Sequence, residues 1–348
     1  MPSTLALSTP SPGAPLAPAT IERRALRDDD VRIQIAFTGL CHTDLHLADN
    51  VWGMTNFPLV PGHEITGIVT EVGAEVTKFS VGDRVGVGVM INSCGVCANC
   101  RSGNENYCAK GYVWSFGWRD YDGTVTLGGL SQSIVVRESF VFRIPDDLGL
   151  DVAAPLLCAG VTMHAPLKHW HAGPGTSVAI VGMGGLGHIG VKIAAAMGAE
   201  VTMLGRSPGK RDDALRFGAV SYADTTDPGT FGELASRFDL IINTAPGNLD
   251  VDAYLSLLRM DGTLVNVGAA PNPVDSYNVF SLINARRSIA GATIGSLRET
   301  QETLDFCAEH HIAPEIETIP VREVSAAWEK LSQARYRYVA DISTFNEE

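Results

Sequence analysis

Residues 177–187 read SVAIVGMGGLG, an apolar run that passes directly into a glycine-rich turn. The run Ser177 to Val181 has the continuous apolar character of a strand that is buried on both faces of a sheet. The turn places Gly182, Gly184 and Gly187 in the G-x-G-x-x-G pattern, immediately before a helical stretch. A strand, this turn and a helix in succession are typical of a domain that binds a dinucleotide.

Each glycine of the turn has a physical task in such a domain. Gly182 permits the tight turn, Gly184 lets the backbone approach the pyrophosphate, and Gly187 allows close helix packing. The pyrophosphate would lie on the helix N-terminus, where unpaired N–H groups and the helix dipole favour anions. A purely structural turn is the alternative. The residues expected to bind the cofactor here are Gly182, Met183, Gly184, Gly185, Leu186 and Gly187.

The chain on either side of this turn divides into two regions with different patterns of predicted secondary structure. After Pro155, strands alternate with helices, which predicts an α/β domain with a parallel, doubly wound sheet. Between residues 31 and about 145, short β-like runs lie close together and predict a barrel-like all-β domain. The elements expected are strands at Val31–Ile35, Ile65–Val72, Asp83–Val89, Ser177–Val181, Glu200–Leu204, Phe238–Asn243, Gly262–Val267 and Tyr336–Ile342, and helices at Leu186–Met197 and Glu299–His310.

Length and composition set the class of protein. The 348 residues are 45% hydrophobic and 19% charged, which predicts two folded domains. The net charge of −13 argues against a nucleic-acid partner. No apolar run approaches 18 residues, so we expect no membrane span. Met1–Thr20 is a low-complexity stretch rich in Pro and Ala that does not resemble a secretory signal, so we expect a cytoplasmic enzyme.

Four of the seven cysteines lie close together with the spacing C-x2-C-x2-C-x7-C. Four thiolates at this spacing can surround one tetrahedral zinc ion and fill its coordination sphere, so we expect a structural zinc site. An iron–sulfur cluster and four unrelated buried cysteines are the alternatives. The four residues are Cys94, Cys97, Cys100 and Cys108.

A second set of metal-ligating residues is scattered along the chain: Cys41, His63, Glu64 and Cys158. Two cysteines and one histidine form a known catalytic zinc environment, which leaves the fourth position for water or substrate. Glu64 would be an intermittent ligand or a nearby charge. Taken singly, Cys158 is equally a small core residue and His63 a turn histidine.

The loop after the second strand of the α/β domain indicates which nicotinamide cofactor fits. An NAD site usually offers an acidic residue there for the ribose 2′-hydroxyl. This loop instead contains Arg206, Ser207 and Lys210, which could bind a 2′-phosphate. The sequence therefore favours NADP(H), with a solvated basic loop as the alternative.

These sites, in this order, resemble the zinc-dependent medium-chain alcohol dehydrogenases, and most closely the cinnamyl-alcohol-dehydrogenase-like branch. The resemblance covers nearly the whole chain. The blocks that carry it are Gly39–His46, Pro61–Glu64, the four-cysteine lobe, Pro155–Thr162, Gly182–His188 and Arg335–Val339.

The resemblance implies a GroES-like β-barrel catalytic domain, residues 1–155 completed by 292–348, and a Rossmann cofactor-binding domain, residues 156–291. It implies that Cys41, His63 and Cys158 bind a catalytic zinc, with Glu64 as the exchangeable carboxylate. It further implies that Thr43 and His46 relay the substrate proton and that Asp44 orients a zinc ligand. Relatives are commonly dimers or tetramers, so a homodimer is expected.

The expected activity is hydride transfer between NADP(H) and a primary alcohol or aldehyde, with two zinc ions per chain. Trp52 and Trp114 are expected to line an apolar pocket for aromatic or medium-chain substrates. The alternatives are a non-catalytic NADPH-binding sensor or scaffold, a zinc-free quinone reductase, and an NAD-preferring enzyme, since Arg206 stands where close relatives often carry Ser or Thr.

Overall fold

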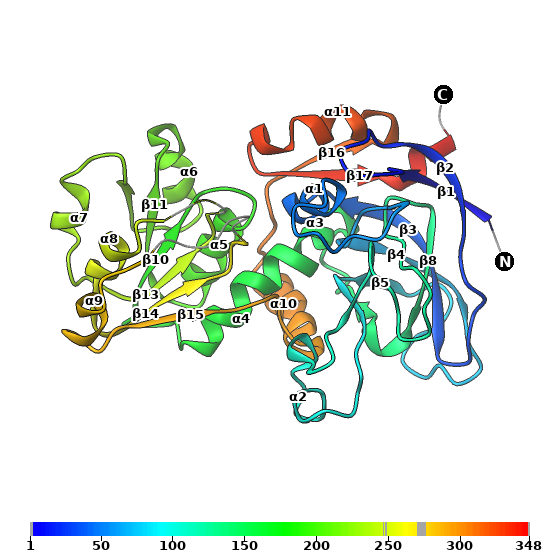
Figure 1. Ribbon diagram of the computed structural model, residues 1–348, viewed down its shortest axis with the longest axis horizontal. Coiled ribbons are helices and arrows are strands. Elements are labelled where there is room, and N and C mark those ends of the chain that lie inside the picture. Colours follow the sequence, from blue (N-terminus) through cyan, green and yellow to red (C-terminus); the bar gives the residue numbers. More distant parts are fainter. Residues whose placement is uncertain (1–2, 246, 248, 270–275, 347–348) are drawn as a thin grey trace. The chain divides into compact units, whose positions relative to one another are not determined.

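The computed structural model describes residues 3–245, 247, 249–269 and 276–346. They form two compact units (Figure 1). The first unit comprises the residues up to Cys158 together with those from Gly295 onward, and the second comprises Ala159–Ile294.

The second unit is built on a six-stranded parallel sheet with the order β12-β11-β10-β13-β14-β15. Its first strand, β10 (Ser177–Val181), is buried at every residue, and the strand order reverses between β10 and β13. The prediction of a doubly wound sheet is therefore confirmed, and ligands of such sheets bind at the carboxyl ends of the strands beside this reversal. The other strands are β11 (Glu200–Gly205), β12 (Ser221–Asp224), β13 (Phe238–Asn243), β14 (Leu258–Asn266) and β15 (Ser288–Gly291).

Helices pack around the sheet, and those from α5 onward lie in the connections between its strands (Figure 1). They are α4 (Val161–His169), α5 (Gly187–Ala196), α6 (Arg211–Arg216), α7 (Thr230–Glu233), α8 (Val251–Ser256) and α9 (Phe280–Ile283). The core between helices and sheet contains Phe238, Ile241 and Leu264, which are at most 1% exposed. Burial of such side chains contributes about 1.5–3 kcal/mol each.

The first unit is centred on a seven-stranded sheet with the order β16-β17-β3-β4-β5-β9, to which β8 adds by pairing with β3. β3 (Asp30–Gly39) pairs with β4 (Ile65–Val72), β8 (Ser133–Arg137) and β17 (Arg337–Asp341), so the C-terminal segment completes this sheet. The remaining elements are β5 (Arg84–Val87), β6 (Met90–Asn92), β7 (Val113–Trp114), β9 (Phe142–Arg143), β16 (Ile316–Pro320), α1 (His42–Ala48), α2 (Ala98–Arg101), α3 (Leu150–Pro155), α10 (Leu297–Glu309) and α11 (Val324–Glu329).

The described part of the Pro- and Ala-rich N-terminal stretch, from Ser3 onward, contains two strands. β1 (Ser3–Ser8) and β2 (Ala17–Glu22) pair antiparallel, and Ala6 and Leu7 are buried. The physical reason is that three of the prolines, Pro10, Pro12 and Pro15, fall in the connection between the strands, where they take no hydrogen bond from the pairing. The Pro- and Ala-rich composition therefore does not prevent this segment from forming paired strands.

One helical run among the described residues, Leu150–His169, is long and apolar enough to cross a membrane. Of its most apolar window, 83% is buried inside the protein, as in a core helix. The run comprises α3, a π-helical turn at Leu156–Gly160, and α4. π-helical turns occur frequently at functional sites.

Candidate metal centres and cofactor site

The four scattered metal-ligating residues come together within the first unit. Cys41 lies at the N-cap of α1, His63 and Glu64 immediately precede β4, and Cys158 lies in the π-helical turn. One ligand atom from each residue lies within 4.8 Å of the others, and all four residues are buried. We call this group the Cys41 centre.

Asp44 fixes three parts of the Cys41 centre at once. Its Oδ2 accepts a hydrogen bond from the Cys41 N–H at 3.0 Å, and its Oδ1 accepts one from the Gly62 N–H at 2.9 Å. Oδ1 also lies 3.0 Å from His63 Nδ1. This contact directs His63 Nε2 toward Cys158, whose Sγ is 3.3 Å away. A carboxylate behind a histidine ligand sets its tautomer and ring orientation.

Glu64 forms a buried ion pair with Arg337. The Arg337 Nη2 donates to Glu64 Oε1 at 2.8 Å, and the two side chains are 4% and 0% exposed. Burial raises the pKa of Glu64 to about 8, although Arg337 opposes this shift. The other oxygen, Oε2, is buried without a hydrogen-bond partner among the described residues. An orphaned buried carboxylate oxygen beside two sulfurs and an imidazole fits a metal ion.

The pKa values of the two cysteines of the centre are shifted in opposite directions, downward for Cys41 and upward for Cys158. A hydrogen bond from Cys158 lowers the pKa of the Cys41 thiol well below its ordinary value, and Arg337 adds to this effect. Because the thiolate is the form that ligates metal, Cys41 is prepared for this role in the protein itself.

The four clustered cysteines form the second metal-binding group, at β6, α2 and the loop that follows. The four Sγ atoms lie within 4.8 Å of one another, and Cys100 Sγ lies 3.5 Å from Cys97 Sγ and 3.9 Å from Cys94 Sγ. A tetrahedral zinc site has S–S separations of about 3.8 Å, so the cluster fits this ion. Hydrogen bonds from the Ala109 and Cys100 N–H groups lower the pKa of Cys97 to about 6.

The glycine turn joins β10 to α5 in the second unit. Gly182 has φ +90°, which favours glycine, and a Cβ at Gly187 would lie 1.8 Å from the Gly182 carbonyl oxygen. A Cβ at Gly184 would meet no described atom within 4 Å, so the backbone there is open to a ligand. Lys210 Nζ donates to the Met183 carbonyl at 2.7 Å, which places this cation beside the turn.

The loop after β11 is basic and solvent-accessible. Arg206 and Ser207 are exposed, and the Ser207 N–H donates to the Tyr222 hydroxyl at 3.1 Å. The nearest carboxylate along the neighbouring strand, Asp224, accepts hydrogen bonds from the N–H and hydroxyl of Thr226. The strand end is therefore suited to an anion rather than to a hydroxyl donor.

Both tryptophans predicted to contact substrate border one apolar cluster in the first unit. Trp52 and Trp114 pack against Leu47, Ala48, Leu59 and Phe116. Phe116, which no sequence pattern singles out, stacks on the ring of His63, with the ring centroids 5.3 Å apart. His46 contacts Trp52 edge to face at 5.0 Å, and lies one helical turn from Thr43 on α1.

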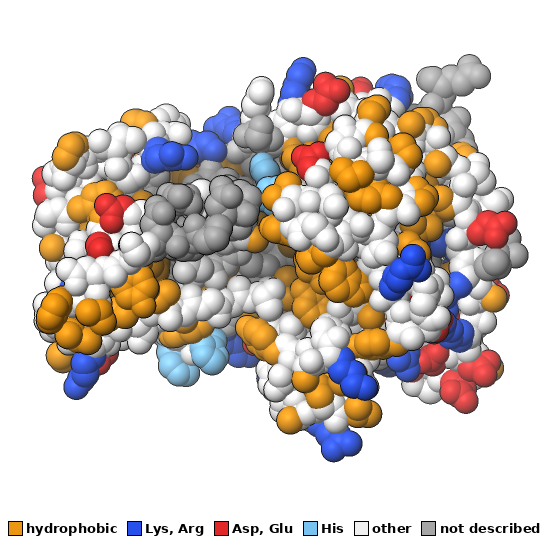
Figure 2. Space-filling model, in the orientation of Figure 1, with side chains coloured by type: hydrophobic (Ala, Val, Ile, Leu, Met, Phe, Trp, Pro, Cys, Tyr) orange, Lys and Arg blue, Asp and Glu red, His pale blue; other side chains and the backbone are white. Residues whose placement is uncertain are grey.

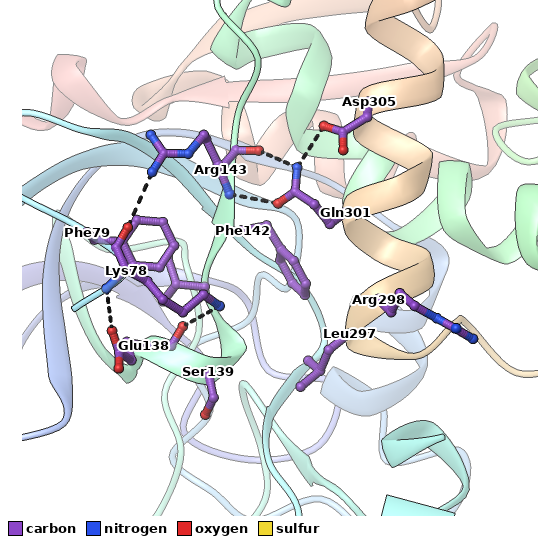
Figure 3. A pocket seen from close by; sticks show the side chains of 11 residues that line it. Lys78, Phe79, Glu138, Ser139, Phe142, Arg143, Leu297, Arg298, Gln301 and Asp305 are labelled. Atoms are coloured by element: carbon purple, nitrogen blue, oxygen red, sulfur yellow. Dashed lines mark hydrogen bonds between the residues drawn. The ribbon is translucent and has the colours of Figure 1, made fainter. Parts of the chain in front are cut away.

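A separate cavity of about 700 Å³ opens in the first unit between β9 and α10 (Figure 3). Phe142, Arg143 and Gln301 contribute to its wall, and Gln301 is hydrogen-bonded to both the N–H and the carbonyl of Arg143. It contains none of the residues predicted from the sequence to bind metal, cofactor or substrate.

Comparison with known proteins agrees with this geometry. Residues 27–146 match the alcohol dehydrogenase GroES-like domain, and residues 185–309 match the zinc-binding dehydrogenase domain. The chain is 57% identical to a probable formaldehyde dehydrogenase of Bacillus subtilis (98% of both chains) and 52% identical to an NADP-dependent alcohol dehydrogenase of Mycolicibacterium smegmatis (99% of both). A cinnamyl alcohol dehydrogenase structure from Sorghum bicolor superposes with a TM-score of 0.96 at 40% identity, covering 100% of this chain and 99% of that one.

The chain therefore belongs to the zinc-dependent medium-chain alcohol dehydrogenases. It is an oxidoreductase with a GroES-like domain and a Rossmann domain, and the predicted fold class and family are both confirmed.

Proposed function

We propose that this enzyme interconverts aromatic or medium-chain aldehydes and primary alcohols with NADP(H) as the hydride carrier. The observation that carries the proposal is the Cys41 centre, where two sulfurs, an imidazole and a carboxylate lie within 4.8 Å of one another. The NADP-dependent relative and the basic loop after β11 support the choice of cofactor.

In this proposal the two groups of metal-ligating residues hold two zinc ions with different roles. Cys41, His63 and Cys158 hold the catalytic zinc, and Glu64 is its exchangeable carboxylate neighbour. When bound, zinc supplies a Lewis acid for the substrate oxygen. The four clustered cysteines hold a structural zinc that leaves no open position.

Thr43 and His46 handle the substrate proton in this proposal. Both lie on α1, directly after the ligand Cys41. Burial lowers the pKa of His46, and the neighbouring His42 lowers it further. His46 is therefore neutral at neutral pH and able to accept a proton that Thr43 passes on.

The cofactor assignment is tested with Arg206→Ala. Loss of a charge-assisted contact to a 2′-phosphate costs about 1.5–3 kcal/mol, so the KM for NADPH is expected to rise about 10- to 100-fold. The KM for NADH is expected to stay the same. The measurement is steady-state kinetics with both cofactors, and Arg216→Ala, which removes a cation on α6, is the control. A wild-type enzyme that prefers NADH would overturn the assignment.

The substrate pocket is tested with Trp114→Ala. Losing the aromatic wall is expected to lower kcat/KM for benzaldehyde about tenfold relative to a short aliphatic aldehyde. Trp170→Ala, which removes a tryptophan outside the cluster around Phe116, is expected to keep the wild-type preference. If Trp114→Ala also keeps it, this residue does not line the pocket.

We also propose that two copies associate through the second unit. β15 is the last strand of its sheet, and Val279, Phe280 and Ile283, at and within α9, are 55%, 57% and 58% exposed. Figure 2 shows hydrophobic side chains gathered over α9. An exposed apolar patch, together with a sheet edge that no other described strand covers, favours association with a second chain, and light scattering measures the resulting mass.

A further inference from the structure

Arg23, directly after β2, carries a buried positive charge that is hydrogen-bonded to two carbonyls and a hydroxyl. The residue is only 6% exposed. Burial lowers the pKa of Arg23 to about 9, which leaves the guanidinium charged at neutral pH. Burying a charge costs free energy, so the hydrogen bonds from Arg23 to three acceptors indicate that it holds these groups in place. They are the Leu127 carbonyl at 2.5 Å, the Gly128 carbonyl at 2.7 Å and the Ser131 hydroxyl at 2.5 Å.

The turn that Arg23 holds, Leu127–Ser131, is hydrogen-bonded to the segment that leads into His63. Each carbonyl of residues 60–62 accepts an N–H from this turn. The bonds run from Gly128 N to Val60 O at 2.7 Å, from Leu130 N to Pro61 O at 2.9 Å, and from Gly129 N to Gly62 O at 2.9 Å. The segment thus lies between this turn on one side and Asp44, which binds the Gly62 N–H, on the other.

The turn Leu127–Ser131 and residues 60–62 are in close backbone contact, with no space between them for an added side chain. A Cβ at Gly62 would lie 2.8 Å from Leu130 N, and a Cβ at Gly128 would lie 2.5 Å from the Gly62 oxygen. Both distances are shorter than atoms in proteins tolerate, so a displacement of the turn must displace residues 60–62. His63 and Glu64 follow immediately in the chain.

We propose that Arg23 is a positioning residue for the Cys41 centre. By holding Leu127–Ser131 against Val60–Gly62, it sets the place of His63 and Glu64 relative to Cys41 and Cys158. The proposal rests on the proposed function, since it requires this centre to bind zinc. It concerns metal retention as well as activity, because residues behind the ligands of a metal determine its affinity.

The test compares Arg23→Met with Arg84→Met in the zinc-loaded enzyme. Arg84 is the control because its guanidinium likewise donates to three acceptors in the first unit, in this case the carbonyls of Pro145, Asp146 and Leu148, which are far in sequence from residues 60–62. We expect Arg23→Met to release the zinc of the Cys41 centre to a chelator about tenfold faster than wild type. The d–d absorption of the cobalt-substituted centre should also shift. Arg84→Met should release at the wild-type rate.

The release phase of the Cys41 centre is the one that disappears in Cys158→Ala. Arg23→Lys, which keeps the charge but offers one donor group, should release zinc at an intermediate rate and serves if the methionine variant does not fold. Equal release from both Arg23 variants and Arg84→Met would overturn the inference alone. A wild-type enzyme that binds one zinc per chain would overturn the proposed function, and the inference with it.

Discussion

Cys158→Ala is expected to lower kcat/KM about 1,000-fold and to leave one zinc ion per chain instead of two. A Lewis acid supplies several kcal/mol of stabilisation to the charge that develops on oxygen, and each 1.4 kcal/mol is about tenfold in rate. Without the Cys158 sulfur, the Cys41 centre retains the Cys41 thiolate, the His63 imidazole and Glu64. Even with the unpartnered Glu64 Oε2 as a ligand, this smaller set binds zinc more weakly. Metal analysis by mass spectrometry and steady-state kinetics measure the two effects.

Cys307→Ala is the matched control for this variant. Cys307 is also a fully buried cysteine of the first unit, but it belongs to neither metal-binding group. It should keep two zinc ions and wild-type kinetics, with only the modest loss of stability that a small core truncation causes. Full activity of Cys158→Ala with one zinc bound would remove Cys158 from the catalytic centre.

The sequence predicts the second unit well because its strands obey a simple rule. A strand that is buried on both faces must be apolar throughout, and the run Ser177–Val181 coincides with β10 residue for residue. The expected strand at Phe238–Asn243 likewise coincides with β13. The glycine turn is equally readable, since only glycine fits where a Cβ would overlap a carbonyl oxygen.

The N-terminal strands are not apparent in the sequence, because neither composition nor pattern indicates them. Counting Pro and Ala predicts low complexity. In β1 the polar Thr4 is buried and the apolar Leu5 is exposed, while Ala6 and Leu7 are both buried, so no apolar alternation marks the strand.

The candidate site was predictable as a list of ligands but not as a network. Cysteine and histidine are recognisable as metal ligands by their residue type. Arginine and phenylalanine have many ordinary roles, so nothing in their residue type singles out Arg337, Arg23 or Phe116. Their importance depends on contacts across the chain, such as the Arg337–Glu64 pair 273 positions apart. One sequence feature does indicate a buried partner for Arg337. It lies in a predicted strand, Tyr336–Ile342, and a charged residue in a buried strand is usually paired.

The buried Arg337–Glu64 pair is expected to contribute strongly to the stability of the first unit. Arg337→Met is expected to lower the free energy of unfolding of the first unit by about 1–3 kcal/mol, because it leaves the buried Glu64 Oε1 without its hydrogen-bond partner. Arg32→Met is the matched control: Arg32 also contacts a glutamate, Glu71, at 2.8 Å, but Glu71 is 55% exposed. An exposed pair contributes less than about 1 kcal/mol.

Urea unfolding followed by tryptophan fluorescence measures both variants, with equal zinc present throughout. Four of the five tryptophans, at positions 52, 114, 118 and 328, lie in the first unit, so the signal reports mainly on it. If burial decides the strength of the pair, Arg337→Met must shift the midpoint several times further than Arg32→Met. Equal shifts would mean that water reaches Glu64 in solution, and a carboxylate open to water would not have the pKa of about 8 that burial gives it.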